Sequence, residues 1–161
     1  MVKRAEPTDI IRELDSAVNV FNDRAKREGI TIVYNRPEIK APMSADKNLI
    51  KQVFANVLDN AFKYTKSPGR VAVFAELTVD SVVISIADTG CGISKEDLPH
   101  ITEKFYKANV SVRGSGIGLA VVDEIIRLHD GKLDIASTPG RGTVVTIILP
   151  IDKTIDIPEE F

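Results

Sequence analysis

Apolar residues in this chain switch between helical and strand spacing, and the order of the switches limits the possible folds. Helical spacing covers 10–25, 49–62 and 117–128, and strand-like runs cover 30–34, 71–79, 82–87, 132–136 and 143–149. The two pairs of adjacent strand-like runs predict hairpins, so the sheet is at least partly antiparallel. The helices are too few for a doubly wound βαβ fold. The sequence therefore predicts a two-layer α/β sandwich, with a mixed, mostly antiparallel sheet packed on three main helices.

Individual residues predict where these elements begin and end. Thr8 is expected to cap the first helix, which should end near Gly29. Asp46 is expected to cap the second helix, and a short helical piece should start at Ser94. Gly131 is the expected C-cap of the third helix.

Length and composition fit one small globular domain. The chain has 161 residues, of which 43% are apolar and 27% charged. We assign residues 1–151 to one domain and the acidic segment 152–161 to a C-terminal tail that leaves the core. The formal net charge of -2 lacks the basic surplus of a nucleic-acid binder, so no nucleic-acid partner is expected. The single cysteine, and the absence of an apolar run of about 20 residues, favour a cytoplasmic location.

An acidic residue and two glycines follow the predicted strand 82–87. Asp88 provides a carboxylate acceptor, and Gly90 and Gly92 let a flat ligand approach the backbone closely. An adenine amino group matches that acceptor. An ordinary turn with a capping aspartate is the alternative. The Asp-Thr-Gly triplet at 88–90 also occurs in aspartic proteases, but their fold is mostly strand and has no place for three amphipathic helices.

Three polar residues share one face of the second predicted helix. Asn56, Asn60 and Lys63 are spaced by four and three residues, which brings them together on a helix. Amide oxygens suit Mg²⁺, and a lysine ammonium group suits phosphate oxygen. A solvated helix face is the alternative.

Small residues open the third predicted helix. Gly114, Gly116 and Gly118, followed by Leu119, leave backbone N–H groups and the helix dipole free to face a phosphate. The spacing is neither the dinucleotide fingerprint nor a Walker A loop. By itself the cluster therefore does not identify a ligand.

These clusters stand in a fixed order along the chain, with the aromatic pair Phe105 and Tyr106 before the second glycine cluster and Gly140, Gly142 and Thr143 at the end. In that order they resemble the catalytic ATP-binding domain of sensor histidine kinases, within the GHKL ATPase superfamily. The resemblance covers about residues 46–149. It implies the GHKL ATP-binding fold, with ATP and Mg²⁺ as cofactors.

The same resemblance implies roles for individual residues. Asn60 would ligate Mg²⁺ with help from Asn56, and Lys63 would contact phosphate. Asp88 would accept the adenine amino hydrogen, and Phe105 would anchor a lid that runs to about Ser115. The remaining nucleotide-binding residues that it implies are Tyr64, Gly90, Gly92, Ile93, Arg113, Gly114, Gly116, Gly118, Leu119 and Thr143.

Asn56 separates this chain from other members of the superfamily. In topoisomerases, heat-shock chaperones and serine-phosphorylating anti-sigma factors, the matching residue is typically a glutamate that acts as general base. Water and serine need such a base, whereas a neutral imidazole is already nucleophilic. Asn56 therefore favours phosphoryl transfer to histidine over a hydrolysing ATPase. A non-catalytic nucleotide-binding module that uses ATP only to dock a partner is the alternative.

Neither histidine of the chain lies in a phosphoacceptor sequence. Neither His100 nor His129 is followed by the full set of an acidic residue, Arg or Asn, and Pro that marks the acceptor in the family's dimerisation helices, and only Asp130 after His129 matches any part of it. The resemblance therefore implies that the acceptor histidine belongs to a separate dimerisation domain, and that a response regulator receiver domain is a further partner. The isolated chain is expected to be a monomer that does not phosphorylate itself. Its parent is expected to be a homodimer, and a membrane anchor in that parent is compatible with this reading.

Overall fold

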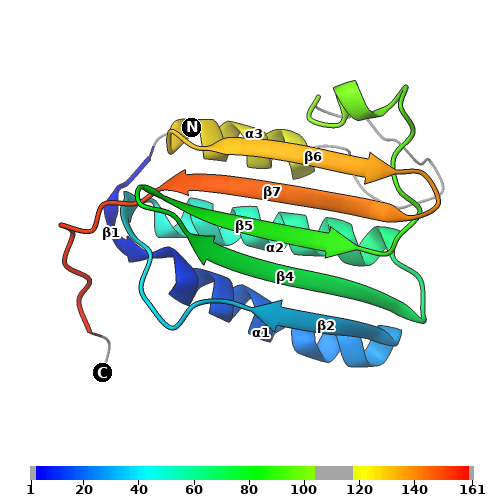
Figure 1. The fold of residues 1–161 in the computed structure, drawn as a ribbon, viewed down its shortest axis with the longest axis horizontal. Coiled ribbons are helices and arrows are strands. Elements are labelled where there is room, and N and C mark those ends of the chain that lie inside the picture. The colour runs from blue at the N-terminus through cyan, green and yellow to red at the C-terminus, as the bar shows by residue number, and fades with distance from the viewer. Residues whose placement is uncertain (1–2, 104–117, 160–161) are drawn as a thin grey trace.

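The computed structural model describes residues 3–103 and 118–159 (Figure 1). Its elements are β1 (Glu6–Asp9), α1 (Ile10–Glu28), β2 (Ile30–Asn35), β3 (Pro42–Ala45), α2 (Lys47–Tyr64), β4 (Gly69–Leu77), β5 (Ser81–Asp88), the 3₁₀ helix η1 (Leu98–His100), α3 (Gly118–Leu128), β6 (Lys132–Thr138) and β7 (Gly142–Pro150).

A five-stranded sheet forms one layer and the three α-helices form the other. The strand order is β2-β4-β5-β7-β6. Strand β2 pairs with β4 in parallel, and every other neighbouring pair is antiparallel. All three helices lie on one side of the sheet (Figure 1). The predicted two-layer sandwich with a mixed, mostly antiparallel sheet is confirmed, as are the β4–β5 and β6–β7 hairpins.

A second, two-stranded sheet of β1 and β3 was not predicted, and it changes the cap of α1. Thr8 pairs with Met43 in that sheet, and its hydroxyl donates to the Glu6 carbonyl at 2.9 Å. Asp9 caps the helix instead, because its Oδ1 accepts the Ile11 N–H at 3.1 Å. The prediction of Thr8 as the cap was wrong by one residue.

The other helix ends follow the expected chemistry, with one correction. Gly29 ends α1 in the left-handed conformation with φ at 66°, and the Asp46 side chain caps α2. At the end of α3 the left-handed residue is Asp130, with φ at 60°, and not Gly131. Gly131 is the next residue of a Schellman motif, in which its N–H donates to the Ile126 carbonyl at 2.9 Å.

The main hydrophobic core fills the space between the sheet and the helices. Its largest fully buried side chains are Phe54, Phe62, Ile10, Leu14, Ile50, Leu58, Ile84, Ile86, Ile125, Ile126, Ile147 and Leu149. None of the helices in the described ranges is long and apolar enough to cross a bilayer.

The segment that follows β7 stays close to the fold. The Asp152 N–H donates to the Pro42 carbonyl at 2.8 Å, and Ile157 is only 8% exposed. The expectation that residues 152–161 leave the core is therefore wrong for Ile157. Removing an apolar side chain from water lowers the free energy of the folded chain, and this keeps Ile157 and its neighbours packed on the protein.

Candidate functional site

Most of the predicted site residues that the structure describes gather at one end of the sandwich, on the right in Figure 1. The C-terminal end of α2, the end of β5 with its following loop, the β6–β7 turn and the first turn of α3 meet there. Backbone hydrogen bonds join three of these parts. The Cys91 N–H donates to the Tyr64 carbonyl at 3.2 Å, and the Gly140 N–H donates to the Cys91 carbonyl at 2.7 Å. The structure therefore brings together residues that are far apart in the chain.

Asp88 is a half-buried carboxylate of which one oxygen is already bonded. Its Oδ1 accepts the Gly90 N–H at 2.8 Å and the Thr143 N–H at 3.3 Å. Burial raises the pKa of Asp88 above its ordinary value, although these two N–H groups act in the opposite direction. Within the described ranges no group donates to Oδ2. The side chain is thus oriented through Oδ1, and Oδ2 can accept a hydrogen from a ligand.

The glycines around Asp88 are required because backbone segments approach each other closely. A Cβ at Gly90 would lie 2.4 Å from the Tyr64 carbonyl oxygen, and one at Gly142 would lie 1.9 Å from the Asp88 carbonyl oxygen. Gly92 has φ at +73°, and a Cβ there would lie 2.2 Å from the Thr138 carbonyl oxygen. The sequence interpretation assigned Gly90 and Gly92 to the close approach of a flat ligand. In the structure they let the loop dock on α2 and on the β6–β7 turn, which positions Asp88.

The predicted polar face of α2 lies at the same end. Asn56, Asn60 and Tyr64 recur every four residues and are all half-buried. Lys63 is exposed, and its Nζ lies 2.9 Å from Asp59 Oδ2. This ion pair was missed, although the spacing of four residues on a helix is a signal that sequence reasoning can use.

Asp59 also links α2 to α1. The guanidinium of Arg24 donates to Asp59 Oδ1 at 2.7 Å and lies over the ring of Phe62 at 5.3 Å. Burial by itself would raise the pKa of Asp59, but the hydrogen bonds from Lys63 and Arg24 outweigh it, so the pKa is lowered. Lys63 would therefore have to break its ion pair with Asp59, or keep it while binding a second anion, in order to contact a phosphate.

A small second hydrophobic cluster packs under the loop that follows Asp88 and against the start of α3. Ile93 and Leu119, both predicted to bind nucleotide, are buried together with Ile101. The Ile93 N–H donates to Ser137 Oγ at 2.7 Å, and that hydroxyl lies 2.9 Å from Thr143 Oγ1. Ile93 and Leu119 therefore support the site through packing. Sequence reasoning missed Ser137, because a single serine in a strand has no distinguishing spacing.

Four of the predicted residues, Phe105, Arg113, Gly114 and Gly116, lie outside the described residues. Gly118 begins the described part of α3, and a Cβ there would meet nothing within 4 Å in the described ranges.

Neither histidine belongs to this site. His129 is 1% exposed and lies at the other end of α3, where its Nε2 accepts the Asp46 N–H at 3.0 Å and its Nδ1–H donates to the Ile125 carbonyl at 2.8 Å. These two bonds require the neutral ring. His100 is exposed, with Nδ1 at 2.8 Å from Glu103 Oε1. His129 is therefore a structural residue that links α3 to the start of α2.

The donor set near the polar face fits magnesium only weakly on its own. Within residues 3–103 and 118–159, no three His, Cys, Asp or Glu side chains gather as they would to hold a metal ion. Asn56 and Asn60 offer neutral amide oxygens, the donor type that Mg²⁺ accepts alongside water and phosphate. The residues present therefore fit an ion that arrives with a polyphosphate.

The chain is similar in sequence to proteins of a known ATPase family. Residues 45–153 match the family model described as histidine kinase-, DNA gyrase B-, and HSP90-like ATPase. The chain is 37% identical over 145 residues to the non-motile and phage-resistance protein of Caulobacter vibrioides, covering 85% of this chain and 17% of that protein. It is 33% identical over 156 residues to sensor histidine kinase Hik2 of Thermosynechococcus vestitus, covering 94% of this chain and 40% of that protein. The chain thus spans less than half the length of either relative.

Solved structures show the same fold. The mycobacterial sensor histidine kinase MprB superposes with a TM-score of 0.79 at 28% identity, over 91% of this chain and 98% of that chain. The catalytic domain of histidine kinase ThkA superposes with a TM-score of 0.82 at 22% identity, over 92% of this chain and 96% of that chain, which shows the shared fold. The chain therefore belongs to the histidine kinase-, DNA gyrase B- and HSP90-like ATPase family, as an ATP-binding catalytic domain of the sensor histidine kinase type.

Proposed function

We propose that this chain binds ATP with Mg²⁺ and presents the γ-phosphate to a histidine on a separate phosphoacceptor domain. The observation that carries the proposal is Asp88, a half-buried carboxylate oriented through Oδ1 with Oδ2 left to accept a ligand hydrogen. A related structure supports it. The full-length ShkA structure in complex with AMPPNP superposes with a TM-score of 0.78 at 27% identity, over 94% of this chain and 32% of that chain.

At the adenine end, Asp88 reads the base. Its Oδ2 accepts a hydrogen from the adenine amino group, and its partial burial strengthens that bond because little water competes. Tyr64 is half-buried on the adjacent helix and provides an aromatic surface beside the base. Gly90 and Thr143 hold the carboxylate in place through their N–H groups.

At the phosphate end, the polar face of α2 meets the triphosphate. Asn56 and Asn60 hold the Mg²⁺ ion, which when bound offsets the negative charge of the phosphates. Lys63 exchanges its ion pair with Asp59 for a phosphate oxygen. The N-terminal end of α3 turns its dipole toward the same charge. Catalysis then consists of positioning and charge neutralisation, as phosphoryl transfer requires.

The absence of a base at position 56 selects the acceptor. An amide cannot take a proton from water or serine, whereas a neutral imidazole attacks without prior deprotonation. Both ring nitrogens of His129 are already hydrogen-bonded inside the protein, and His100 pairs with Glu103 on the surface. The acceptor histidine therefore comes from a dimerisation and phosphoacceptor domain, which in a homodimeric parent would pass the phosphoryl group to a response regulator receiver domain.

Calorimetry with ATP and a non-hydrolysable analogue, with and without Mg²⁺, tests the binding site. The Asp88→Asn variant keeps an Oδ1 acceptor for Gly90 and Thr143, and it presents an amide donor where the carboxylate Oδ2 would accept. We expect its affinity for ATP to fall at least tenfold, about 1.4 kcal/mol. Asp134→Asn, on the exposed side of β6, is the matched control and should bind as the original chain does. Equal affinities for all three proteins would contradict the assignment of Asp88.

Labelled γ-phosphate tests the reaction. The isolated chain is expected to incorporate no label, and a phosphoacceptor domain from the parent kinase is expected to become labelled on histidine when the chain and ATP are added. Asn60→Asp and Asp88→Asn should reduce both nucleotide binding and labelling. Labelling that persists without nucleotide binding would contradict the enzyme assignment, and steady phosphate release from the isolated chain would point to a hydrolysing ATPase.

A further inference from the structure

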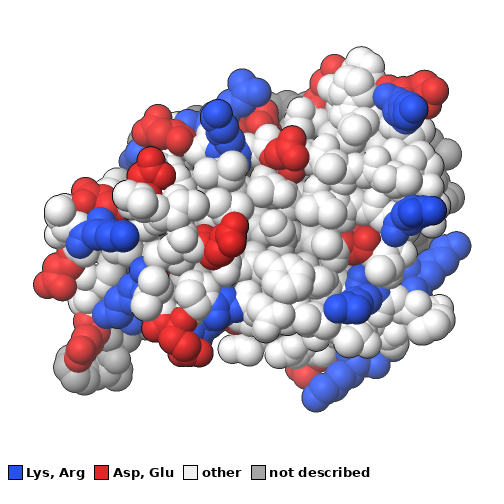
Figure 2. All heavy atoms as spheres, in the orientation of Figure 1, with Lys and Arg blue, Asp and Glu red and all other residues white. Residues whose placement is uncertain are grey.

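The face of the sheet that turns away from the helices is open, and its middle is uncharged (Figure 2). The register of the strands arranges its outward residues in rows. The first row, nearest Asp88, consists of Val33, Ala72, Ala87, Val144 and Ala136, one from each strand. All five are small and apolar. Val144 and Ala136 are exposed, Val33 and Ala87 are half-buried and Ala72 is buried. An apolar row with exposed members on an open sheet face is a feature of surfaces that meet another protein.

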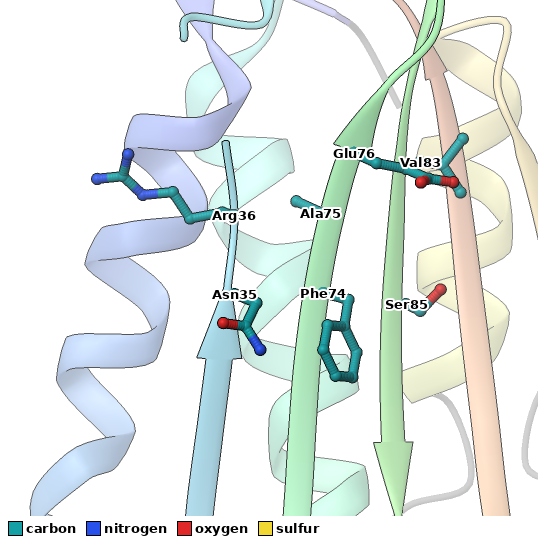
Figure 3. A pocket seen from close by; sticks show the side chains of 7 residues that line it. All are labelled: Asn35, Arg36, Phe74, Ala75, Glu76, Val83 and Ser85. Carbon is teal, nitrogen blue, oxygen red and sulfur yellow. The ribbon is translucent and has the colours of Figure 1, made fainter. Parts of the chain in front are cut away.

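The second row places one large aromatic side chain on this face. Phe74 stands between Asn35 and Ser85 and is 43% exposed. The surface beside its ring is hollowed by about 500 Å³ (Figure 3). The residues that line the hollow are Asn35, Arg36, Phe74, Ala75, Glu76, Val83 and Ser85.

The third row carries opposite charges at its two ends. Glu76 on β4 pairs with Val83, Val83 pairs with Ile148, and Ile148 pairs with Lys132 on β6. Glu76 and Lys132 are both exposed, and about 14 Å separates their strands, since neighbouring strands lie about 4.8 Å apart. The row therefore has an acidic end, an apolar middle and a basic end.

Such a row is complementary to itself under two-fold symmetry. We infer that the open face of the sheet packs against the same face of a second copy of this chain. The two-fold axis runs along the strands between β5 and β7. It places Glu76 of each copy over Lys132 of the other, and Val83 over Ile148. A C₂ interface requires this kind of self-complementary patch.

The geometry suits the packing of two sheets. Sheets stack about 10 Å apart with their strands nearly aligned, a gap that extended glutamate and lysine side chains can bridge. The same axis brings Phe74 of each copy over Asp134 of the other, because both belong to the second row, with the small Ala136 of the first row beside them. Four strands by three rows give roughly 400 Å² per copy, about half of a standard interface, so the association should be weak. Dilute chain is therefore expected to be monomeric.

The inference does not depend on the proposed function, because nucleotide takes no part in it. Sedimentation equilibrium of the chain without ATP, up to about 2 mM, tests for this weak association. We expect concentration-dependent dimers, and concentration-dependent NMR shifts in the outward residues of β4, β5 and β7. A chain that stays monomeric throughout, or shifts that fall on the helices instead, would overturn it.

Charge reversal tests the two-fold arrangement itself. Glu76→Lys and Lys132→Glu should each weaken association at least tenfold, because each places like charges opposite one another twice. The double variant should restore it to within about threefold of the original chain. Glu124→Lys and Lys26→Glu, exposed on α3 and α1, are matched controls and should leave the association unchanged. Dimers that tolerate both single reversals would show that another surface is used and overturn the inference.

Discussion

Single residues at the nucleotide end are held by backbone groups from distant parts of the chain. Asp88 accepts the N–H groups of Gly90 and Thr143, and the first of these lies in its own loop while the second starts β7. The side chain is thus oriented before any ligand arrives. Preorganised acceptors of this kind make the site sensitive to one proton and to one added methyl group.

Because the pKa of Asp88 is raised, nucleotide affinity and the stability of the nucleotide-free chain should depend on pH in opposite directions. Adenine nucleotide affinity should fall as the pH is lowered through this pKa, because the protonated carboxyl loses an acceptor. The stability of the nucleotide-free chain should change the other way. A folded state that binds the proton more readily than the unfolded chain gains stability as the pH falls from the raised pKa toward the ordinary value.

Calorimetric titrations and urea denaturation between pH 4 and 8 measure the two trends. Asp88→Asn is the control, since it has no titrating group there and should remove this contribution from both profiles. Identical pH profiles for the two proteins would contradict the prediction.

Gly142 and Gly140 form a matched pair for a test of backbone crowding. A Cβ at Gly142, where φ is +135°, would lie 1.9 Å from the Asp88 carbonyl oxygen, whereas a Cβ at Gly140, where φ is +78°, meets nothing within 4 Å in the described ranges. Gly142→Ala should therefore lower the free energy of unfolding by at least about 3 kcal/mol. Gly140→Ala should lower it by only about 1 kcal/mol. Urea denaturation measures the free energy of unfolding of both variants. Equal decreases in the two variants would contradict the prediction.

At the scale of elements, two helices are joined at the end opposite the nucleotide site. His129 at the end of α3 accepts the Asp46 N–H, and Asp46 caps α2. Helix α2 carries Asn56 and Asn60, and α3 begins at the glycine cluster. This one hydrogen bond therefore helps to fix the relative position of the two helices that carry the proposed phosphate contacts.

Replacing His129 should cost more stability than the net contribution of one hydrogen bond. His129→Leu leaves the buried Asp46 N–H without an acceptor and the Ile125 carbonyl without a side-chain donor, so the free energy of unfolding should fall by about 2–3 kcal/mol. His100→Leu is the matched control on the surface and should change it by less than about 0.5 kcal/mol. Chemical denaturation measures both, and a His129→Leu variant as stable as the control would contradict the role assigned to the ring.

At the scale of the whole molecule, ligand binding should appear as thermal stability. ATP with Mg²⁺ at 100 times its dissociation constant should stabilise the chain by about 2.7 kcal/mol. For a domain of this size that corresponds to a rise in Tm of about 5–10 °C. Scanning calorimetry measures the rise, which should shrink without Mg²⁺ and fall to about half or less in Asp88→Asn at the same ATP concentration. GTP is the matched ligand, because guanine has a carbonyl where adenine has its amino group, and an equal rise with GTP would contradict the role of Asp88.

Much of the fold and of the candidate site follows from local chemistry in the sequence. The spacing of apolar residues predicted all three helices and the strands of both hairpins, and Asp46 and Gly29 marked helix ends, because capping and periodicity depend on neighbours within a few residues. The polar face of α2 and the Asp88 loop were found for the same reason. What the resemblance implies for Phe105 and Arg113 remains a prediction.

Only the tertiary structure decided which distant groups meet. It paired β1 with β3, which moved the α1 cap from Thr8 to Asp9, and it set β2 parallel to β4. It joined Arg24 to Asp59, His129 to Asp46, and Ser137 to the Asp88 loop. These contacts link residues separated by long stretches of chain, so their formation depends on how the sheet and helices pack and leaves no periodic trace. The sequence by itself thus determined the elements and the chemistry of the site residues, and the packing of those elements decided how the site is held.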